Sequence, residues 1–514
     1  MKKNIIKFKL LHTLFLAMAA SILFVSCGKD DDDVVVPPTT PIVKPNIVFY
    51  GLTNANQIIK YNANATQTPD AALAITGLQP SELLTSIDFR PATGQLYGLG
   101  SSSRLYTINL NSGVATALGA SSFTPAITGT ITNIDFNPTV DRVRLVSNNG
   151  QNLRLHPELG TVVATDLPIM GNASPSISSI AYTNNIAGAA TTDLFDIDFS
   201  TKKLFKQTPP NDGTLVEVGN LNVNFAGRVG FDINTDNSAI LATMVVSNVV
   251  KLYSINTSTA ATTFISDISA QIIDIAIPTN PVAYAISDAG QFQIFDPTKA
   301  NSVNSKTIVG LNAGEDILGI DFRPATGQLY GITTNALGMG RMITFNLSTG
   351  AVAAVGAGFN LTVGTVAAGL DFNPTVDRIR YVSNVGQNLR FNPIDGTIAA
   401  TDANLNPGSP SIHAAAYTNN FAGATSTMLF VMDATKLYLQ NPPNNGTLVE
   451  IGTLGVTVDA QNGFDIGGRT NNAFGLFTVA NATKVYTINT TSGAIAAGID
   501  YPNKVRAMAV GLGF

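Results

Sequence analysis

The sequence is short of several residue types, and each shortage excludes a class of protein. Of its 514 residues, one is Cys, none is Trp and three are His. A single Cys excludes a disulfide framework and a zinc site built on cysteines. Charged residues make up 12% of the chain, about half their usual share, whereas the apolar share of 45% is ordinary. The chain has ample apolar surface to bury, so it is not a disordered polyelectrolyte.

The same shortages limit the possible functions. None of the histidines recurs at an equivalent position of the internal repeat described below. The chain therefore offers few residues that could act as nucleophile or base in His- or Cys-based nucleophilic catalysis. The formal net charge is −5, and removing residues 1–26, which hold four lysines and no acid, makes it −9. With no basic stripe, we expect no nucleic-acid partner. The glycine-rich stretches follow neither a P-loop nor a dinucleotide-binding pattern, and we expect no cofactor.

The N-terminus has the pattern of a secretory signal. Four lysines precede an apolar run from Leu14 to Val25, which is too short for a comfortable membrane span. The run ends at Phe24-Val25-Ser26-Cys27, which resembles a bacterial lipobox, although Phe24 stands where Leu is usual. Residues 1–26 are therefore predicted to be a lipoprotein signal peptide, with Cys27 as the lipidated residue. The alternative is an ordinary signal peptide followed by a buried Cys.

Residues 27–45 are predicted to be a tether. Asp30–Asp33 form an acidic run, and Pro37, Pro38, Pro41 and Pro45 stiffen the segment that follows. The acidic run resembles the export tag that Bacteroidota lipoproteins carry after the lipidated Cys. That resemblance implies an outer-membrane lipoprotein displayed at the cell surface, with the lipid as its only anchor. The alternative is a solvated charge run without an export role.

The rest of the chain is a tandem duplication. The eleven residues Asp88–Gly98 recur without change at Asp321–Gly331, 233 positions later. Three further motifs recur at similar offsets, and the small differences in offset fall where loops are expected. We therefore expect two units of similar structure, residues 46–277 and residues 278–514.

Within each unit a shorter period appears. Five triplets of the form apolar–X–apolar follow one another at spacings of 44 to 51 residues, and the central residue runs Asp, Asp, Ala, Asp, Ala in both copies. The triplets are Ile87–Phe89, Ile134–Phe136, Ile180–Tyr182, Phe231–Ile233 and Ile275–Ile277, then Ile320–Phe322, Leu370–Phe372, Ala415–Tyr417, Phe464–Ile466 and Met508–Val510. A period of this length built from short strands is typical of β-propeller blades.

One period shows the expected blade. Strands are predicted over 86–90, 95–99, 104–110 and 114–118, separated by turns rich in Gly, Asn, Ser and Pro. Four such strands form an antiparallel meander. No part of the mature chain keeps a helical period with caps, so we expect few helices. The fold class predicted is all-β, a β-propeller of ten four-stranded blades.

Ten blades can close as two five-bladed rings or as one ten-bladed ring. The last triplet lies near the C-terminus with no outer strands after it, whereas residues 47–77 lack an inner strand. A blade assembled from both ends leaves no free sheet edge. In the two-ring arrangement, 273–277 closes on 47–77 and 505–510 closes on 282–310. We prefer two rings, because a duplication implies an ancestral unit able to close alone.

The repeated motifs resemble a known family. Asp321–Gly331, Asp371–Arg390 and Asn441–Gly446 are similar to segments of an uncharacterised bacterial family, domain of unknown function 4394. The resemblance covers both copies and nearly all of residues 46–514. It implies no reaction, ligand or catalytic residue.

Aspartates at the centre of six triplets are the first candidate residues for chemistry. A half-buried carboxylate needs hydrogen-bond donors, and the backbone of a nearby turn or blade offers them. We therefore expect these aspartates to pin turns or blade contacts, and we predict no metal site; a metal ring at the channel mouth is the alternative. The residues are Asp88, Asp135, Asp232, Asp321, Asp371 and Asp465.

The third repeat of each copy is unusually polar for a chain with so little charge. Arginine forks beside amides suit carboxylates and sugar hydroxyls, while an Arg–Asp network joining neighbouring blades explains the same residues. Both interpretations stay open. The candidate ligand-binding residues are Asp141, Arg142, Arg144, Asn152 and Arg154, with Asp377, Arg378, Arg380, Asn388 and Arg390 in the second copy.

One further segment has a metal-like pattern. Asp232-Ile-Asn-Thr-Asp-Asn-Ser begins like a calcium-binding loop, but it lacks the glycine at position six and has Thr243 in place of Glu at position twelve. We interpret it as a turn.

The leading functional hypothesis is a non-catalytic, surface-displayed propeller that binds a glycan or a protein. A secreted hydrolase or lyase using paired carboxylates at a channel mouth is the alternative, since sequence alone cannot pair acids in space. A structural or adhesive surface protein is the third. No catalytic residue is predicted.

Overall fold

The computed structural model describes residues 44–171, 175–299, 302–496 and 498–514. The predicted signal peptide, Cys27 and the tether up to residue 43 lie outside the described residues. The described part is built of strands, and its only helices are two single 3₁₀ turns, η1 (Pro210–Asp212) and η2 (Pro443–Asn445). In this part of the chain, no helix has the length and apolar character needed to cross a membrane.

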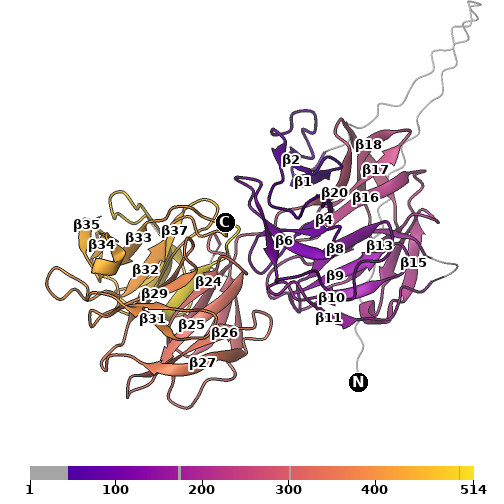
Figure 1. The fold of residues 1–514 in the computed structure, drawn as a ribbon. Coiled ribbons are helices and arrows are strands. Elements are labelled where there is room, and N and C mark those ends of the chain that lie inside the picture. Colours follow the sequence, from indigo (N-terminus) through magenta and orange to yellow (C-terminus); the bar gives the residue numbers. More distant parts are fainter. Residues whose placement is uncertain (1–43, 172–174, 300–301, 497) are drawn as a thin grey trace, which may run out of the picture. The chain divides into compact units, whose positions relative to one another are not determined.

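The strands form ten antiparallel sheets of four strands each (Figure 1). Five sheets come from the first copy. From the innermost strand outward they are β20 (Ile272–Ala276), β1 (Val48–Thr53), β2 (Gln57–Asn62) and β3 (Leu73–Ala74); β4 (Leu84–Phe89), β5 (Leu96–Gly100), β6 (Arg104–Ile108) and β7 (Ala115–Leu118); β8 (Thr132–Asn137), β9 (Arg142–Ser147), β10 (Asn152–Leu155) and β11 (Val162–Thr165); β12 (Ile177–Tyr182), β13 (Leu194–Asp198), β14 (Lys203–Gln207) and β15 (Leu215–Asn220); β16 (Ala226–Ile233), β17 (Ile240–Val246), β18 (Val249–Ile255) and β19 (Thr262–Ile268).

Five sheets come from the second copy and repeat this order. They are β40 (Val505–Val510), β21 (Ala283–Ser287), β22 (Gln291–Phe295) and β23 (Val303–Thr307); β24 (Asp316–Arg323), β25 (Gln328–Thr334), β26 (Met339–Phe345) and β27 (Val352–Asn360); β28 (Ala368–Asn373), β29 (Arg378–Ser383), β30 (Asn388–Phe391) and β31 (Ile398–Thr401); β32 (Ala414–Tyr417), β33 (Leu429–Met432), β34 (Lys436–Gln440) and β35 (Leu448–Thr453); β36 (Gly463–Ile466), β37 (Ala473–Val479), β38 (Ala482–Ile488) and β39 (Ile499–Asp500).

Each copy closes on itself. Strand β20 pairs with β1, with Ile275 opposite Gly51, and β40 pairs with β21, with Met508 opposite Ala285. The innermost strands contact one another in the cyclic order β20, β4, β8, β12, β16 and back, and in the order β40, β24, β28, β32, β36 and back. We call these circuits the first ring and the second ring. A single ring of ten blades would instead require β40 to pair with β1.

The blade predicted from residues 86–118 is observed as β4 to β7, with strand ends shifted by at most two residues. Inner strands are buried on both faces because each packs between two neighbouring blades. Strand β12, for example, is buried along all six residues. Outer strands such as β11 alternate between half-buried and exposed residues, as expected where one face meets water.

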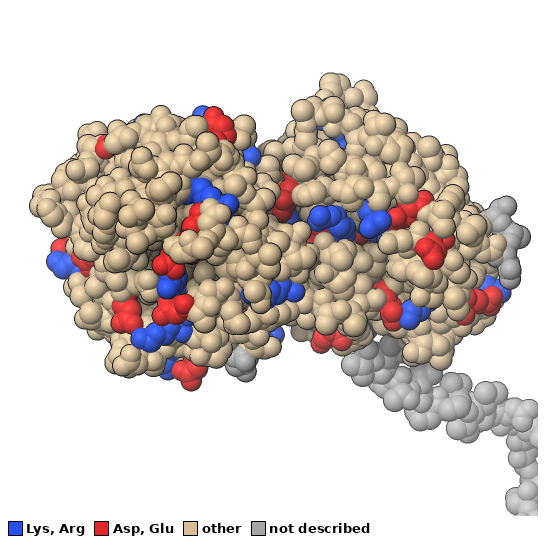
Figure 2. All heavy atoms as spheres, turned by 90° about the horizontal axis from the view of Figure 1, so that it is seen from below, with Lys and Arg blue, Asp and Glu red and all other residues tan. Residues whose placement is uncertain are grey.

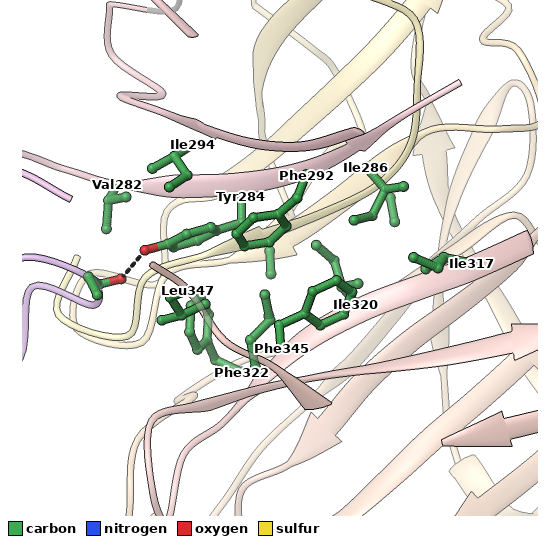
Figure 3. Close-up of a cluster of buried hydrophobic side chains, with 14 of the residues drawn as sticks. Val282, Tyr284, Ile286, Phe292, Ile294, Ile317, Ile320, Phe322, Phe345 and Leu347 are labelled. Atoms are coloured by element: carbon green, nitrogen blue, oxygen red, sulfur yellow. Dashed lines mark hydrogen bonds between the residues drawn. The ribbon is translucent and has the colours of Figure 1, made fainter. Parts of the chain in front are cut away.

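The core consists of apolar clusters between neighbouring sheets. In the second ring, Tyr284 and Phe345 each stack on Phe292, with ring centroids 5.3 and 5.2 Å apart (Figure 3). These residues lie on β21, β22 and β26, so the cluster joins two blades. On the face drawn in Figure 2, charged side chains are few and scattered, in keeping with the composition.

Candidate functional site

Arg144, on β9, is at the centre of a buried hydrogen-bond network and is 2% exposed. Its Nη1 donates to Asn152 Oδ1 at 2.8 Å and to Asp166 Oδ2 at 2.5 Å. Its Nη2 donates to Asn211 Oδ1 at 2.7 Å, and its Nε lies 3.3 Å from the Tyr182 hydroxyl. Tyr182 and the η1 turn that carries Asn211 belong to the next blade. This arginine therefore joins two blades, as the structural interpretation of Arg144 and Asn152 predicts.

The neighbouring arginines extend the network toward solvent. Arg154 binds both oxygens of Asp166, through Nε and Nη2, each at 2.8 Å. Asp166 thus accepts from two arginines, and the Arg154 side chain is 33% exposed. Arg142 donates from Nη1 to the carbonyl of Asp141 at 2.8 Å. Within the described residues no carboxylate forms a salt bridge with Arg142, so its charge is not balanced by a direct partner.

The second ring repeats this network. Arg380 donates to Asn388, Asp402 and Asn444 at 2.6–2.7 Å, and Arg390 binds both oxygens of Asp402 at 2.8 Å. Burial would raise the pKa of Asp402, but the hydrogen bonds from the two arginines hold that pKa below its ordinary value. Arg378 donates to the Asp377 carbonyl at 2.8 Å, as Arg142 does to Asp141. Both copies therefore carry the same constellation.

In the structure, the carboxylates of Asp141 and Asp377 bind arginines that are not among the predicted ligand-binding residues. Each carboxylate accepts two hydrogen bonds, from Nε and Nη2 of an arginine on the preceding blade. Asp141 accepts them from Arg90 at 2.9 and 2.5 Å, and Asp377 accepts them from Arg323 at 2.8 and 2.5 Å. Arg90 also donates to Glu158 at 2.9 Å. Burial raises the pKa of Glu158 to about 6. These two aspartates hold blades together through their side chains.

Beside the network in the first ring is a cavity of about 200 Å³. It is smaller than a pocket for a drug-sized ligand, which is on the order of 300–1,000 Å³. Three arginines, one tyrosine and two amides supply its polar surface. The lining residues are Asn137, Val140, Arg142, Arg144, Arg154, Tyr182, Pro209, Pro210 and Asn211. The lining arginines outnumber Asp166, the acid that pairs with two of them, so an anionic group suits this cavity electrostatically.

Sequence reasoning missed several members of the network. Asp166, Asn211 and Tyr182 hold Arg144, yet they lie 22, 67 and 38 residues from it in the chain. A signal for them existed, because each recurs in the second copy, as Asp402, Asn444 and Tyr417. The recurrence marks them as important but does not indicate that they meet.

The strand aspartates bridge neighbouring blades, as expected. Asp88 accepts the backbone N–H of Phe89 and, from the next blade, that of Phe136, each at 2.7 Å. Asp321 does the same with Phe322 at 2.7 Å and Phe372 at 2.6 Å. The remaining strand aspartates follow the same pattern of accepting N–H groups from neighbouring blades, namely Asp135, Asp232, Asp371 and Asp465.

These aspartates also meet one another. In each ring three carboxylates offer oxygens that all lie within 4.8 Å of one another, Asp88 with Asp135 and Asp232, and Asp321 with Asp371 and Asp465. Burial raises the pKa of all six, to about 8 for Asp232 and to about 7 for Asp465. The sequence predicted the blade contacts but not this clustering.

The calcium-like segment forms a turn, as expected. Asn234 Oδ1 accepts the backbone N–H of Ala239 at 2.9 Å, and Asp236 Oδ1 accepts that of Ser238 at 3.0 Å. Asn237 has a φ of 59°, which a tight turn requires. Asn234 Oδ1 and Asp236 Oδ1 thus accept hydrogen bonds within the turn, whereas the oxygens of Asp232 accept the backbone N–H groups of Ile233 and Ile277.

Rings of four-stranded antiparallel sheets, each closed by pairing the last strand of a copy with the first, define this chain as a β-propeller protein. A family model described as domain of unknown function (DUF4394) matches residues 57–276 and again 291–509. The chain belongs to this family and carries two copies of its domain.

Comparison with solved structures finds weak likenesses. Two proteins described as putative 6-phosphogluconolactonases, from Bacteroides uniformis and Bacteroides fragilis, are 14% and 11% identical, with TM-scores of 0.27 and 0.28. The matches cover 64% and 66% of this chain and 98% and 99% of theirs. The Dos1 propeller is 12% identical over 64% of this chain and 83% of its own, with a TM-score of 0.25. A comparison with curated proteins found no match. At these scores the likenesses carry no conclusion about a ligand or a reaction.

Proposed function

We propose that this protein is a non-catalytic propeller that binds an acidic glycan through the cavity beside Arg142, and through the equivalent residues around Arg378. The observation that carries the proposal is the arginine without an acidic partner at the edge of a rigid, hydrogen-bonded network. A guanidinium held in place by its own backbone contact presents its remaining donors to a carboxylate without first losing a salt bridge.

The composition of the cavity supports a sugar acid over a simple anion. Asn137 and Asn211 supply amide groups that can bind hydroxyls, and Pro209, Pro210 and Val140 supply apolar surface for a sugar ring. Arg144 and Arg154 already hold Asp166, so they act as a fixed positive wall. Such preorganised polar groups among apolar ones are usual in small ligand sites.

The proposed site occurs twice, once in each ring, so one ligand molecule can contact two sites. Arg378 keeps the backbone contact of Arg142, and Arg380 and Arg390 keep the network behind it. A polymeric ligand with repeated carboxylates can engage both copies, and the second engagement is then favoured by effective concentration. Under these conditions, weak affinity at each single site is sufficient for the protein to bind the polymer.

We also propose that lipid attached at Cys27 anchors the protein in the outer membrane and that residues 27–45 display the rings at the cell surface. The arrangement of Cys27, acidic run and proline-rich segment in the sequence supports this. Replacing Cys27 with Ser should release the protein from the membrane fraction, and retention of that variant there would contradict the anchor.

The binding proposal is tested with uronic-acid oligosaccharides, neutral oligosaccharides and acidic peptides offered to the soluble body of the protein, residues 44–514. We expect affinity for the acidic sugars alone. Arg142→Gln should weaken it at least tenfold, and the double variant with Arg378→Gln should abolish it. Lys203→Gln, which removes one positive charge from an exposed ion pair with Glu217, is the matched control and should bind like the wild type.

Three results would contradict the proposal: no binding of acidic sugars, equal binding by the double arginine variant, or a preference for acidic peptides. The rival hydrolase or lyase is tested separately with a polysaccharide and peptide library. Turnover that disappears when Asp141 and Asp377 are both changed to Asn would establish the enzyme. Because each of these carboxylates binds an arginine through both oxygens, the protein should also be checked for folding in that experiment.

A further inference from the structure

Arg142 lines two cavities, only one of which belongs to the site proposed above. The first, here called the Arg144 cavity, has a volume of about 200 Å³ and lies beside the Arg144 network. The second, here called the His156 cavity, has a volume of about 210 Å³. Each alone is smaller than a pocket for a drug-sized ligand, which is on the order of 300–1,000 Å³, whereas the two together are not. A ligand that extends from one cavity into the other passes Arg142.

The His156 cavity has one wall from each ring. Strands β26 and β27 and the turn between them supply most of the second-ring wall. Both rings belong to one compact unit, Lys44–Phe514, and beside this cavity Arg90 Nη1 of the first ring donates to the carbonyl of Gly327 of the second ring at 3.0 Å. A ligand in this cavity therefore contacts both rings. The first-ring wall consists of Asp141, Arg142, His156 and Glu158.

Both walls of the His156 cavity present uncharged hydrogen-bond donors. Nδ1 of His156 accepts the backbone N–H of Glu158 at 3.3 Å, so the neutral ring carries its proton on Nε2. Burial lowers the pKa of His156 to about 4, and the charge of Arg142 acts in the same direction, so the ring is neutral at pH 7. On the facing wall, Asn346 Oδ1 accepts the N–H groups of residues 348 and 349 in its own turn, and its amide N–H groups remain for a ligand. Uncharged donors of this kind suit sugar hydroxyls.

The charges around the His156 cavity disfavour a second anionic group. Asp141 and Glu158 both bind the guanidinium of Arg90, at 2.5 and 2.9 Å, so two carboxylates share one buried cation. Burial raises the pKa of Glu158 to about 6, which still leaves this carboxyl ionised at pH 7.5. Arg142 is the one cation that lines the cavity, and in the proposed site it binds the carboxylate of the first sugar. A second carboxylate here would meet the excess negative charge, and such repulsion is a usual source of specificity.

We infer that the first ring binds a uronic acid together with a neutral sugar linked to it. The inference rests on the function proposed above, because the uronic acid takes the Arg144 cavity and binds Arg142. The neutral sugar takes the His156 cavity, where the N–H groups of His156 and Asn346 donate to its hydroxyl oxygens. The carboxylates of Asp141 and Glu158 exclude a second uronic acid there. The ligand class is therefore a glycan in which uronic acids adjoin neutral sugars, and not a chain of uronic acids alone.

The second ring keeps the anion site and lacks the residues that extend it. All nine residues that line the Arg144 cavity recur as the same residue type in the second copy. In contrast, Asn392 and Ile394 stand at the positions of His156 and Glu158. The selection of a neutral neighbouring sugar is therefore assigned to the first ring.

The test uses the full mature chain with Arg378→Gln, which silences the equivalent site of the second ring. Ligand-observed NMR titrations at pH 7.5 compare glucuronic acid, glucuronic acid linked to glucose in either order, and a disaccharide of two glucuronic acids. We expect the mixed disaccharide to bind about tenfold more tightly than glucuronic acid, because the second sugar adds hydrogen bonds. The disaccharide of two glucuronic acids should bind no more tightly than glucuronic acid.

Two further changes in the same chain separate the donors from the charge. His156→Ala should bring the affinity for the mixed disaccharide to within about twofold of that for glucuronic acid. Glu158→Gln keeps the size of the side chain and removes its charge, so the disaccharide of two glucuronic acids should then bind about as tightly as the mixed one. The matched control is Asn392→Ala, at the position of the second ring equivalent to His156, which should leave the ratio of the affinities unchanged.

Several outcomes would overturn the inference while the proposed function stands. They are equal affinities for the mixed disaccharide and glucuronic acid, equal affinities for the two disaccharides before Glu158 is changed, and a His156→Ala variant that keeps the full gain. If glucuronic acid itself does not bind, the proposed function is wrong and the inference falls with it. If Glu158→Gln does not fold, by circular dichroism, the comparison of the two disaccharides and the His156→Ala variant decide.

Discussion

The inner strands of the two rings carry two layers of equivalent residues, the central residues of the triplets and the residues two positions before them. The two rings share the first layer and differ in the second. Both have Asp, Asp, Ala, Asp, Ala at the centres of their five inner strands. Two residues earlier, the first ring has mostly polar side chains, and the second has only glycine and alanine. The first ring has Ser86, Asn133, Ser179, Gly230 and Asp274, and the second has Gly319, Gly369, Ala414, Gly463 and Ala507.

The shared layer has a role in closing both rings. Its aspartates accept N–H groups from the neighbouring inner strand, so a change there would loosen two blades at once. The neighbouring layer has diverged, and only the first ring uses its side chains to join blades. There, Ser86 Oγ donates to Asp274 Oδ2 at 2.5 Å and accepts the N–H of Ile134 at 3.0 Å. In the second ring, the inner strands instead approach closely at the glycine positions.

A second difference lies between the second and third blades of each ring. Arg90 is fully buried and meets both Asp141 and Glu158, at 2.5 and 2.9 Å. Its counterpart Arg323 meets Asp377 alone, and Ile394 stands where Glu158 would be. The side chains of Arg323 and Asp377 are 12% and 35% exposed. The equivalent ion pair is therefore buried in the first ring and partly exposed to solvent in the second ring.

Arg90→Ala should cause the largest loss of stability. It leaves Asp141 and Glu158 buried without their cation, which costs about 3–5 kcal/mol of unfolding free energy. Arg323→Ala leaves a partly exposed aspartate that water can solvate, and should cost about 1–3 kcal/mol. Denaturant unfolding followed by far-UV circular dichroism measures both. Equal losses would show that the difference in burial between the rings has no energetic consequence.

Repetition and turn chemistry in the sequence predicted most of the fold. Four strands per repeat, few helices and the pairing of 273–277 and of 505–510 with the start of their own copies all follow from triplets, turns and termini. These features are local or periodic. The network around Arg144 could be predicted only in part, because Asp166 and Asn211 reach it from other strands and turns.

The clustered aspartates show the limit most clearly. The sequence placed Asp321, Asp371 and Asp465 on equivalent strands, but their separation depends on the width of the ring. In the second ring, Gly369 lets its strand approach Ala414 and Ala415 on the next inner strand more closely than a Cβ would allow. A periodic pattern specifies which residues are equivalent and leaves their distance open.

Gly369→Ala tests how closely the inner strands approach, and should have the second-largest effect. A Cβ at this position would run into the backbone of Ala414 and Ala415 on the next inner strand. Backbone cannot rotate away as a side chain does, so we expect a loss of about 3 kcal/mol. In the first ring, Asn133→Ala keeps a Cβ that is already accommodated and loses the bond from Asn133 Nδ2 to the Ser178 carbonyl. That change should cost about 1–2 kcal/mol. Thermal unfolding of both variants measures the two losses of stability. A smaller loss for Gly369→Ala than for Asn133→Ala would contradict the close approach of the inner strands.

Asp274→Asn should have an effect that depends on pH and is small only at acidic pH. Asp274 has no acidic counterpart in the second ring, where Ala507 takes its place. Burial raises the pKa of Asp274 to about 7, against hydrogen bonds from Ser86, Ile87 and Ile275 and the positive charge of Arg228. The acids Asp88, Asp135 and Asp232 also face it.

The sign of this pH dependence follows from proton binding. The native carboxyl keeps its proton up to a pH of about 7, whereas the unfolded chain loses it near 3.9, so the native state binds more protons between these values. Asp274 therefore lowers the stability of the first ring as the pH rises through this window, by up to about 1.4 kcal/mol per pH unit. The Asn variant has no such proton to lose, so its Tm relative to the wild type should rise steadily from pH 5 to pH 7 and then level off. Ala507→Ser, a change of similar size at the equivalent position of the second ring, introduces no titrating group and should show a constant offset. Parallel curves for Asp274→Asn and the wild type would mean that Asp274 ionises in the folded ring as it does in water, and that the polar layer of the first ring solvates it.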